Sequence, residues 1–347
     1  MVSSSMTDRH AWARPEPEPV TRDVVRVPLP LPNDALRAVN VYVLVSVDDL
    51  TLVDGGWALA QSRELLQAAL AGVGAEIADV RRFLVTHLHR DHYTLATVLA
   101  RETGARVALG TGERDSMSLL TGPDPAAPYR ARIERLRQVG APTLADEVEE
   151  DTAAAIAAER DSYTEPDDWL ADGEVCDVAG RRLVAHETPG HTRGHLVFAD
   201  DDAGLLFAGD HVLPHITPSI GFEPAARPGA LIRFLSSLAA LRAQPDRRLL
   251  PAHGPVAASV HIRVDQLLAH HEERLKETER AVEAGDGTAA EAAARLRWTR
   301  HELRLPEMAP THRMLAVLET QSHLEVLEAQ GRVHRDTDGN VVHYRVP

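Results

Sequence analysis

Short apolar runs, each closed by glycine, proline or polar residues, recur along most of the chain and follow the pattern of buried β-strands. These runs cover residues 24–31, 39–45, 50–56, 83–86, 106–109, 174–178, 182–187, 196–200, 204–208 and 247–251. The second and third runs flank Asp48 and Asp49 and predict a hairpin. Apolar residues at helical spacing predict helices over 62–70, 92–102 and 227–243, with Ser62 as an N-cap. Strands and helices that alternate in this way indicate layered α/β packing.

From about residue 262 the pattern changes to long helices without strands. Helical spacing covers three stretches, 264–284, 288–296 and 311–331. Two short β-prone segments then flank a turn at Gly339, and helices followed by such a hairpin look like a winged-helix module. The third helix carries Glu319, Glu325 and Glu328, whose charge opposes phosphate contacts. We therefore expect this module to serve packing or dimerisation rather than DNA binding.

The composition is that of a soluble globular protein. The 347-residue chain has a net charge of −15, with 44% hydrophobic and 26% charged residues. This acidic balance opposes general nucleic-acid binding, because phosphate contacts need clustered Lys and Arg. Cys176 is the only cysteine, which excludes an internal disulfide and fits a reducing cytoplasm. We expect Cys176 to be a small buried residue.

Three parts can be distinguished along the chain. Residues 1–22, rich in Ser, Pro, Glu and Arg, predict a mobile lead-in. The α/β pattern predicts one large domain over 23–260, and the helical pattern predicts a C-terminal domain over 261–347. The N-terminus lacks a basic region followed by an apolar run, and no apolar span of about 18 residues occurs. We expect a soluble, cytoplasmic protein that does not contact a membrane.

The densest cluster of candidate ligands follows the strand predicted at 83–86. His87, His89, Asp91 and His92 lie within six consecutive positions. Loops at the carboxyl ends of strands are where α/β folds commonly place their chemistry. Imidazole and carboxylate groups bind zinc, iron and manganese. Four such donors exceed what one tetrahedral metal with an open position uses, so the cluster indicates two metals.

Three later loops repeat this design, since each carries histidine or aspartate directly after an apolar run or a small-residue turn. The side chains concerned are His191, His195, Asp210, His211 and His253. Four such loops in this order resemble the metallo-β-lactamase superfamily of metallohydrolases, over roughly residues 24–260. The resemblance implies an α/β fold of the αββα sandwich type, here with a helical insertion and a C-terminal winged-helix-like domain.

The resemblance also implies a ligand set for two divalent metal ions, zinc first, with iron or manganese as alternatives. The first ion is assigned His87, His89 and His191, the second Asp91, His92 and His253, and Asp210 bridges the two. A pair of metals lowers the pKa of a shared water, and the bridging hydroxide attacks a carbonyl or phosphoryl centre. Asp91 is also placed to accept the proton of that water, so Asp91 and Asp210 are the predicted catalytic residues.

Several polar residues fall outside this ligand set. By the resemblance, Asp54 lies beneath the metals, although an aspartate that merely caps its turn is an equal alternative. By the same resemblance, His195 supports the site without binding metal. Arg90 lies between two ligands and could hold an anionic group of the substrate.

The remaining histidines divide into two pairs. His211 and His215 follow Asp210 closely and could line the pocket, without a role as ligands. His270 and His271 begin a long helix, and we expect them on the surface.

Residues 111–172 form an insertion that is rich in Ala, Glu and Arg. The pattern predicts helices over 128–139 and 144–161 and no strand. Because the insertion lies between the first ligand loop and His191, we expect a cap that shapes the substrate pocket. The alternative is a pair of surface helices without a role in the site.

The candidate branches of the superfamily differ in their ligands. All seven ligands occur together in glyoxalase II, quorum-type lactonases, transfer-RNA processing nucleases and lactamase-β-like proteins, and the last group also carries a winged-helix-like module. Asp210 argues against a true β-lactamase, which lacks a bridging aspartate there. His89 in place of glutamate argues against the diiron flavoproteins. No basic cluster of the kind that glyoxalase II uses for glutathione follows His253.

These comparisons of ligands leave three functions. We expect a hydrolase of a small thioester, ester or lactone, with acyl-coenzyme A as a candidate. A metal-dependent endoribonuclease of the lactamase-β-like type is the alternative, although the acidic charge disfavours it. The third is a non-catalytic regulator that binds a metal or a metabolite. The helical C-terminal domain is a candidate interface for a homodimer.

Overall fold

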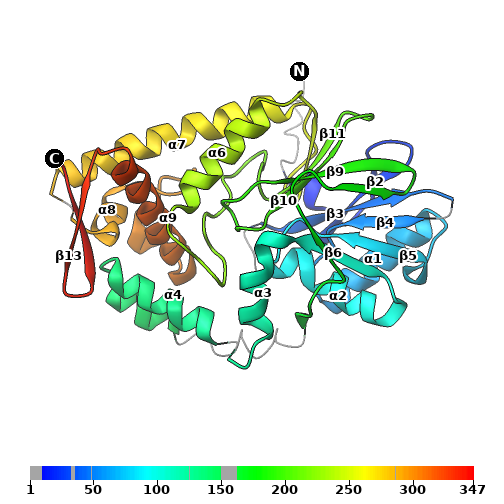
Figure 1. Ribbon diagram of the computed structural model, residues 1–347, viewed down its shortest axis with the longest axis horizontal. Helices are drawn as coiled ribbons and strands as arrows, with labels where there is room; N and C mark the ends of the chain where they lie inside the picture. The colour runs from blue at the N-terminus through cyan, green and yellow to red at the C-terminus, as the bar shows by residue number, and fades with distance from the viewer. Residues whose placement is uncertain (1–9, 33–35, 48, 125, 150–161, 286) are drawn as a thin grey trace, which may run out of the picture.

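The computed structural model describes residues 10–32, 36–47, 49–124, 126–149, 162–285 and 287–347. Two β-sheets pack face to face, and helices cover the outer face of each sheet (Figure 1). This arrangement confirms the predicted αββα sandwich.

The first sheet has seven strands that follow one another in chain order. They are β1 (Glu18–Pro19), β2 (Val24–Pro30), β3 (Ala38–Val45), β4 (Leu50–Val53), β5 (Val80–Leu84), β6 (Arg106–Gly110) and β7 (Asp168–Leu170). Neighbouring strands are antiparallel from β1 to β4 and parallel from β4 to β7. The predicted hairpin is β3–β4, and Asp48 at its turn lies outside the described residues.

The second sheet has five strands in the order β12-β11-β10-β9-β8. They are β8 (Val175–Val178), β9 (Arg181–Glu187), β10 (Leu196–Asp200), β11 (Leu205–Gly209) and β12 (Arg248–Pro251). Only β11 and β12 run parallel within this sheet, so their carboxyl ends lie side by side.

Side chains that alternate along each strand fill different cores, because successive residues of a strand point to opposite faces. Along β3, Val41 and Val43 pack under the helices of the first sheet, whereas Tyr42 and Leu44 fill the space between the sheets. Phe207 of β11 also lies in this inner core. Cys176 is buried there too, as predicted.

Helices cover the two outer faces. The first sheet is covered by α1 (Ala60–Gly72) and α2 (Arg90–Thr103), and the second by α6 (Ala230–Arg242) and α7 (Val260–Glu283). Ser62 does not cap α1, which begins after Leu59; it is buried inside the helix instead. Single turns of 3-10 helix are η1 (Ala11–Ala13), η2 (Ile77–Asp79), η3 (Thr111–Glu113) and η5 (Leu305–Glu307).

The C-terminal part contains helices and a hairpin in the predicted order. They are α7, α8 (Ala289–Arg295), α9 (Pro310–Ala329), β13 (His334–Asp338) and β14 (Val341–Arg345). Thr288 caps α8 through a capping box with Glu291. Helix α9 packs against α6, α7 and α8, and the carboxylate of Glu325 accepts the Gly229 N–H at 2.7 Å. These contacts fit a packing role for α9, while its likeness to a winged-helix module stays a prediction.

Two segments differ from the sequence-based expectation. Part of the lead-in predicted over residues 1–22 belongs to the first sheet, because β1 pairs with β2. The insertion over 111–172 contains β7, a three-residue strand that pairs with β6 and was too short to give an apolar pattern.

The helices of the insertion are partly as predicted. They are α3 (Arg114–Thr121), α4 (Ala127–Gln138) and a third that covers 142–149. The remainder of the helix predicted over 144–161 lies outside the described residues. In the part of the chain that the structure describes, no helix has both the length and the apolar character needed to cross a membrane.

The two sheets meet closely behind the loop that carries His191. A Cβ added to Gly194 would lie 2.2 Å from the backbone nitrogen of Glu113, and one added to Gly110 would lie 2.2 Å from the Gly194 carbonyl oxygen. Backbone therefore packs on backbone at this junction, and only glycine fits.

We expect Gly194→Ala to lower the free energy of unfolding by about 3 kcal/mol, because overpacking against backbone cannot be relieved by a side-chain rotation. Gly72→Ala, at the end of α1 where an added Cβ meets nothing within 4 Å, is the control and should leave stability nearly unchanged. Urea unfolding of both variants measures the difference. Equal stabilities would contradict close packing at the junction.

Candidate metal centre

Two loops of the first sheet and three of the second converge at one edge of the sandwich. His87, His89 and His191 contribute nitrogens that lie close together: His87 Nε2 is 2.9 Å from His89 Nδ1, and His191 Nε2 is 2.9 Å from His89 Nδ1 and 3.2 Å from His87 Nε2. With Asp210 they form a group whose donor atoms all lie within 4.8 Å of one another.

The outer nitrogens of two of these rings fix their protonation. His89 Nε2 donates to the Phe222 carbonyl at 2.7 Å, and His191 Nδ1 donates to the Ser219 carbonyl at 2.6 Å. A carbonyl can only accept, so the proton of each neutral ring lies on the outer nitrogen and the inner nitrogen presents a lone pair. Lone pairs that face one another at this distance suit a cation between them.

Asp91, His92 and His253 form a second group of donors. Asp91 Oδ2 lies 3.7 Å from His92 Nε2 and 3.5 Å from His253 Nε2. The outer nitrogen of His253 donates to the Ala38 carbonyl at 2.7 Å, which leaves its inner nitrogen free for a ligand role.

Asp210 lies between the two groups, with one oxygen toward each. Its Oδ2 is 3.5 Å from His191 Nε2, and its Oδ1 is 3.3 Å from His253 Nε2 and 3.7 Å from His92 Nε2. Asp210 Oδ1, His92 Nε2 and His253 Nε2 are buried without a hydrogen-bond partner among the described residues. Buried polar atoms normally have a hydrogen-bond partner, so these three unpartnered atoms fit the role of metal ligands.

Asp54 lies directly beneath both groups. Its Oδ2 accepts the His92 Nδ1–H at 2.9 Å, and its Oδ1 accepts the Thr86 hydroxyl at 3.0 Å and the Thr86 N–H at 2.8 Å. The Thr86 hydroxyl in turn lies 3.1 Å from His87 Nδ1. One carboxylate therefore orients a histidine of each donor group. Asp54 is also one of the few described non-glycine residues with a positive φ, which is 62°.

The electrostatics differ between the two donor groups. Burial, reinforced by the neighbouring imidazoles, lowers the pKa of His87 and brings that of His89 to about 3. Burial alone would raise the pKa of Asp210, but nearby histidines outweigh this effect and hold the pKa well below its usual range. Burial likewise opposes the charged form of His92, yet three carboxylates raise its pKa to about 10. Metal binding at the second group must therefore release a proton.

His195 supports this centre from behind. Its Nε2 accepts the backbone N–H of Asp210 at 3.0 Å, and its Nδ1 lies 2.8 Å from the Thr188 hydroxyl. Both ring nitrogens are thereby engaged, so His195 holds the bridging aspartate in place and belongs to neither donor group.

Other predicted residues lie farther out. His211 is buried against the ring of Phe234, whereas His215 is exposed. The Arg90 guanidinium lies 4.0 Å from the centre of the Trp57 ring. Its proposed contact with an anionic substrate stays a prediction.

The surface position expected for His271 is wrong, although His270 is exposed. His271 is buried, and its Nδ1 lies 3.2 Å from His323 Nε2. The ring faces inward because helix α7 turns this side toward α6 and α9, a choice that depends on helices distant in sequence.

Sequence reasoning missed residues that hold the ligand loops. Asn40 Nδ2 donates to the carbonyls of Pro251 and Gly254 at 2.8 Å each and thereby clamps the loop of His253. An asparagine inside an otherwise apolar strand was the signal that could have revealed it. Glu113 is buried and accepts the Thr192 hydroxyl, next to His191, at 2.5 Å.

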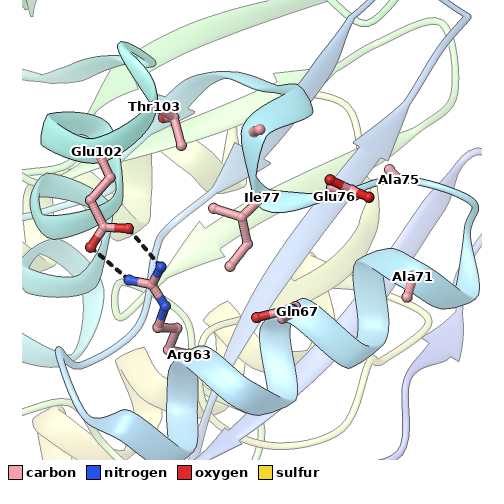
Figure 2. A pocket seen from close by; sticks show the side chains of 9 residues that line it. Arg63, Gln67, Ala71, Ala75, Glu76, Ile77, Glu102 and Thr103 are labelled. Carbon is pink, nitrogen blue, oxygen red and sulfur yellow. Dashed lines mark hydrogen bonds and ion pairs between the residues drawn. The ribbon is translucent and has the colours of Figure 1, made fainter.

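A hollow on the surface lies away from the two donor groups. It measures about 460 Å³ and is bounded by α1, η2 and the end of α2 (Figure 2). Arg63 and Glu102 span it with a bidentate ion pair of 2.7 and 2.6 Å. None of its lining residues belongs to the two donor groups, so it has no part in the candidate chemistry.

We expect Asp54→Asn to weaken zinc binding about 10- to 100-fold, because it removes the carboxylate that orients the ligand histidines. Asparagine tolerates positive φ, so the backbone should be preserved. Competition with a chromophoric chelator gives the affinity. Asp177→Asn, exposed on β8, is the control. An unchanged affinity in Asp54→Asn would contradict the role assigned to Asp54.

Glu113 should make stability depend on pH. Burial and the nearby Glu223 raise its pKa from 4.5 to about 8. Between these values the unfolded chain loses the proton while the folded chain keeps it, so rising pH lowers the free energy of unfolding through this group. Glu113→Gln retains an acceptor for Thr192 and cannot ionise. Its stability relative to the natural protein should therefore increase from about pH 5 to about pH 8.

Urea unfolding at several pH values measures this difference. Glu134→Gln, at an exposed position of α4, should follow the natural protein throughout. If the curves of Glu113→Gln and the natural protein run parallel, the carboxyl of Glu113 does not titrate in this window.

Known proteins of one family resemble the chain along most of its length. Residues 34–253 match the family model described as the Metallo-beta-lactamase superfamily. The chain is 26% identical over 334 residues to the Probable metallo-hydrolase YqjP of Bacillus subtilis. The aligned region covers 94% of this chain and 98% of that protein.

A solved structure and a protein named as a thioesterase are also similar. The metallo-beta-lactamase family protein TTHA1429 from Thermus thermophilus has a TM-score of 0.79 and 28% identity, covering 95% of this chain and 100% of that one. An Atrochrysone carboxyl ACP thioesterase of Aspergillus fumigatus is 25% identical over 250 residues, 71% of this chain and 45% of that protein. The fold, the donor groups and these matches agree: the chain belongs to the metallo-beta-lactamase superfamily.

Proposed function

We propose that this protein is a hydrolase that uses two divalent cations, zinc in the first place, on a small thioester, ester or lactone. The position of Asp210 carries the proposal. Its two oxygens face different donor groups, toward His191 on one side and His253 on the other. One carboxylate between two sets of ligands is what a two-metal centre requires.

Two bound cations would supply a water of lowered pKa and polarise the substrate carbonyl. The protein groups position the reactants around them. Asp91 keeps part of its side chain exposed, 14%, and is proposed to accept the proton that the water releases. Asp54, His195 and the backbone carbonyls hold the ligand rings, so the centre need not reorganise during the reaction.

The thioester class is supported by the relatives. The Aspergillus protein is named as a thioesterase that acts on an acyl carrier protein, and YqjP is named as a metallo-hydrolase. The net charge of −15 favours a small-molecule substrate over RNA, whose phosphates would be repelled. Acyl-coenzyme A remains the candidate among the small thioesters.

We expect Asp210→Ala to reduce turnover about 1,000-fold or more, because losing the shared ligand removes several kcal/mol of transition-state stabilisation. The assay is hydrolysis by zinc-loaded protein of acyl-coenzyme A thioesters, simple lactones and a single-stranded RNA. Circular dichroism should show that the fold survives. Asp202→Ala, exposed in the turn between β10 and β11, is the matched control.

The outcomes separate the candidate functions. Cleavage of a thioester or lactone that is lost in Asp210→Ala supports the proposal. Cleavage of RNA alone would replace it with the ribonuclease alternative. Full activity of the zinc-loaded Asp210→Ala variant would contradict the two-metal centre.

A further inference from the structure

The seven candidate ligands are not equally accessible. Five of them are buried, and only His89 and Asp91 retain exposed surface. A substrate must therefore approach the centre on the side of His89 and Asp91. Side chains that adjoin these two residues are in a position to contact the part of the substrate that does not react.

Phe222 adjoins His89 directly. Its carbonyl accepts the His89 Nε2–H at 2.7 Å, and the two ring centres are 6.1 Å apart. Phe222 and His89 are both half-buried, so each of these neighbouring residues keeps some accessible surface. Phe222 lies in the long loop between β11 and α6.

The helical insertion places the guanidinium group of an arginine over the Phe222 ring. The Arg132 guanidinium of α4 lies 4.0 Å from the centre of the Phe222 ring and 5.5 Å from that of Tyr129. Stacking on an aromatic face orients a guanidinium and leaves its edge available for hydrogen bonds. Arg132 is half-buried, and burial lowers its pKa to about 10, where it is still charged at neutral pH.

Arg132 differs from the neighbouring arginines of α4 in its partners. Arg130 pairs with Asp124, Arg135 approaches Glu325 at 4.0 Å, and Arg137 pairs with Asp146 at 3.0 Å. Among the residues that the structure describes, no carboxylate lies within ion-pair distance of Arg132. A partly desolvated cation without an anion is costly unless a ligand supplies one.

We propose that Arg132, stacked on Phe222, forms an anion-binding subsite beside His89 that holds a carboxylate or phosphate of the substrate. The inference rests on the proposed hydrolase function and specifies its substrate class as anionic thioesters. Such an anion can belong to the acyl group or to a phosphorylated carrier arm, and a guanidinium fork binds either one. In this arrangement the insertion contributes to substrate selection through a single side chain.

Three thioesters test this proposal and distinguish the two sources of the anion. Acetyl-N-acetylcysteamine is neutral, succinyl-N-acetylcysteamine carries a carboxylate on the acyl group, and acetyl-coenzyme A carries phosphates on the carrier. Arg132→Gln is compared with Arg130→Gln, an exposed neighbour on the same helix. We expect Arg132→Gln to lower kcat/KM about 10- to 100-fold, mainly through KM, for one charged substrate and to leave the neutral one unchanged.

The result identifies the source of the anion. A loss confined to the succinyl compound assigns the subsite to the acyl group, and a loss confined to acetyl-coenzyme A assigns it to the carrier. Arg130→Gln should match the natural protein on all three. An equal loss on all three substrates, or none, would overturn the subsite while leaving the hydrolase function intact.

A binding measurement tests the anion-binding subsite independently of catalytic turnover. Non-hydrolysable thioether analogues of the two charged compounds are titrated into the zinc-loaded natural protein and Arg132→Gln by calorimetry. A larger dissociation constant for one analogue in Arg132→Gln supports the subsite even if the protein proves to catalyse a reaction other than thioester hydrolysis. Equal dissociation constants, or no binding by the natural protein, would refute it.

Discussion

Mutual repulsion among the groups at the centre is the constraint on which the rest of the structure depends. Three imidazole nitrogens lie within 3.2 Å of one another with their lone pairs inward, and Asp54, Asp91 and Asp210 add three carboxylates. Against the effect of burial, nearby carboxylates raise the pKa of His92 and His253 and thereby favour the charged forms of these rings. A metal ion bound among these donors would offset the remaining negative charge, so the site favours a cation.

The frame that opposes this repulsion is built mostly of hydrogen bonds to backbone. Carbonyls of Ala38, Phe222 and Ser219 each hold one ligand ring, and Asn40 of the first sheet clamps the loop that follows β12 of the second. Such bonds depend little on which side chains surround them. The geometry of the centre therefore depends little on peripheral side chains such as Arg90 and Arg132.

The loops that carry the candidate ligands could be located from the sequence because most of them follow a strand that the local apolar pattern reveals, whereas the assignment of ligands to two metals came from the family resemblance. The alternation of elements predicted layered α/β packing, and the resemblance to the superfamily specified the αββα sandwich. Asn40, Glu113 and His271 could not be assigned, since their roles depend on contacts with segments far away in the chain. Strand β7 was missed for the same reason: its three residues form a strand only because β6 offers an edge.

One packing contact ties the C-terminal helices to the chemistry. Gly190 lies so close to Phe234 of α6 that an added Cβ would be 2.4 Å from the Phe234 Cβ, and the Phe234 ring contacts His271 of α7. The same apolar core continues through α8 and α9. A protease that cut the chain between His253 and α7 would therefore remove the helices that support Phe234, and with it the loop that carries His191. Such a cut would leave all seven candidate ligands on the chain but would loosen the packing behind one of them.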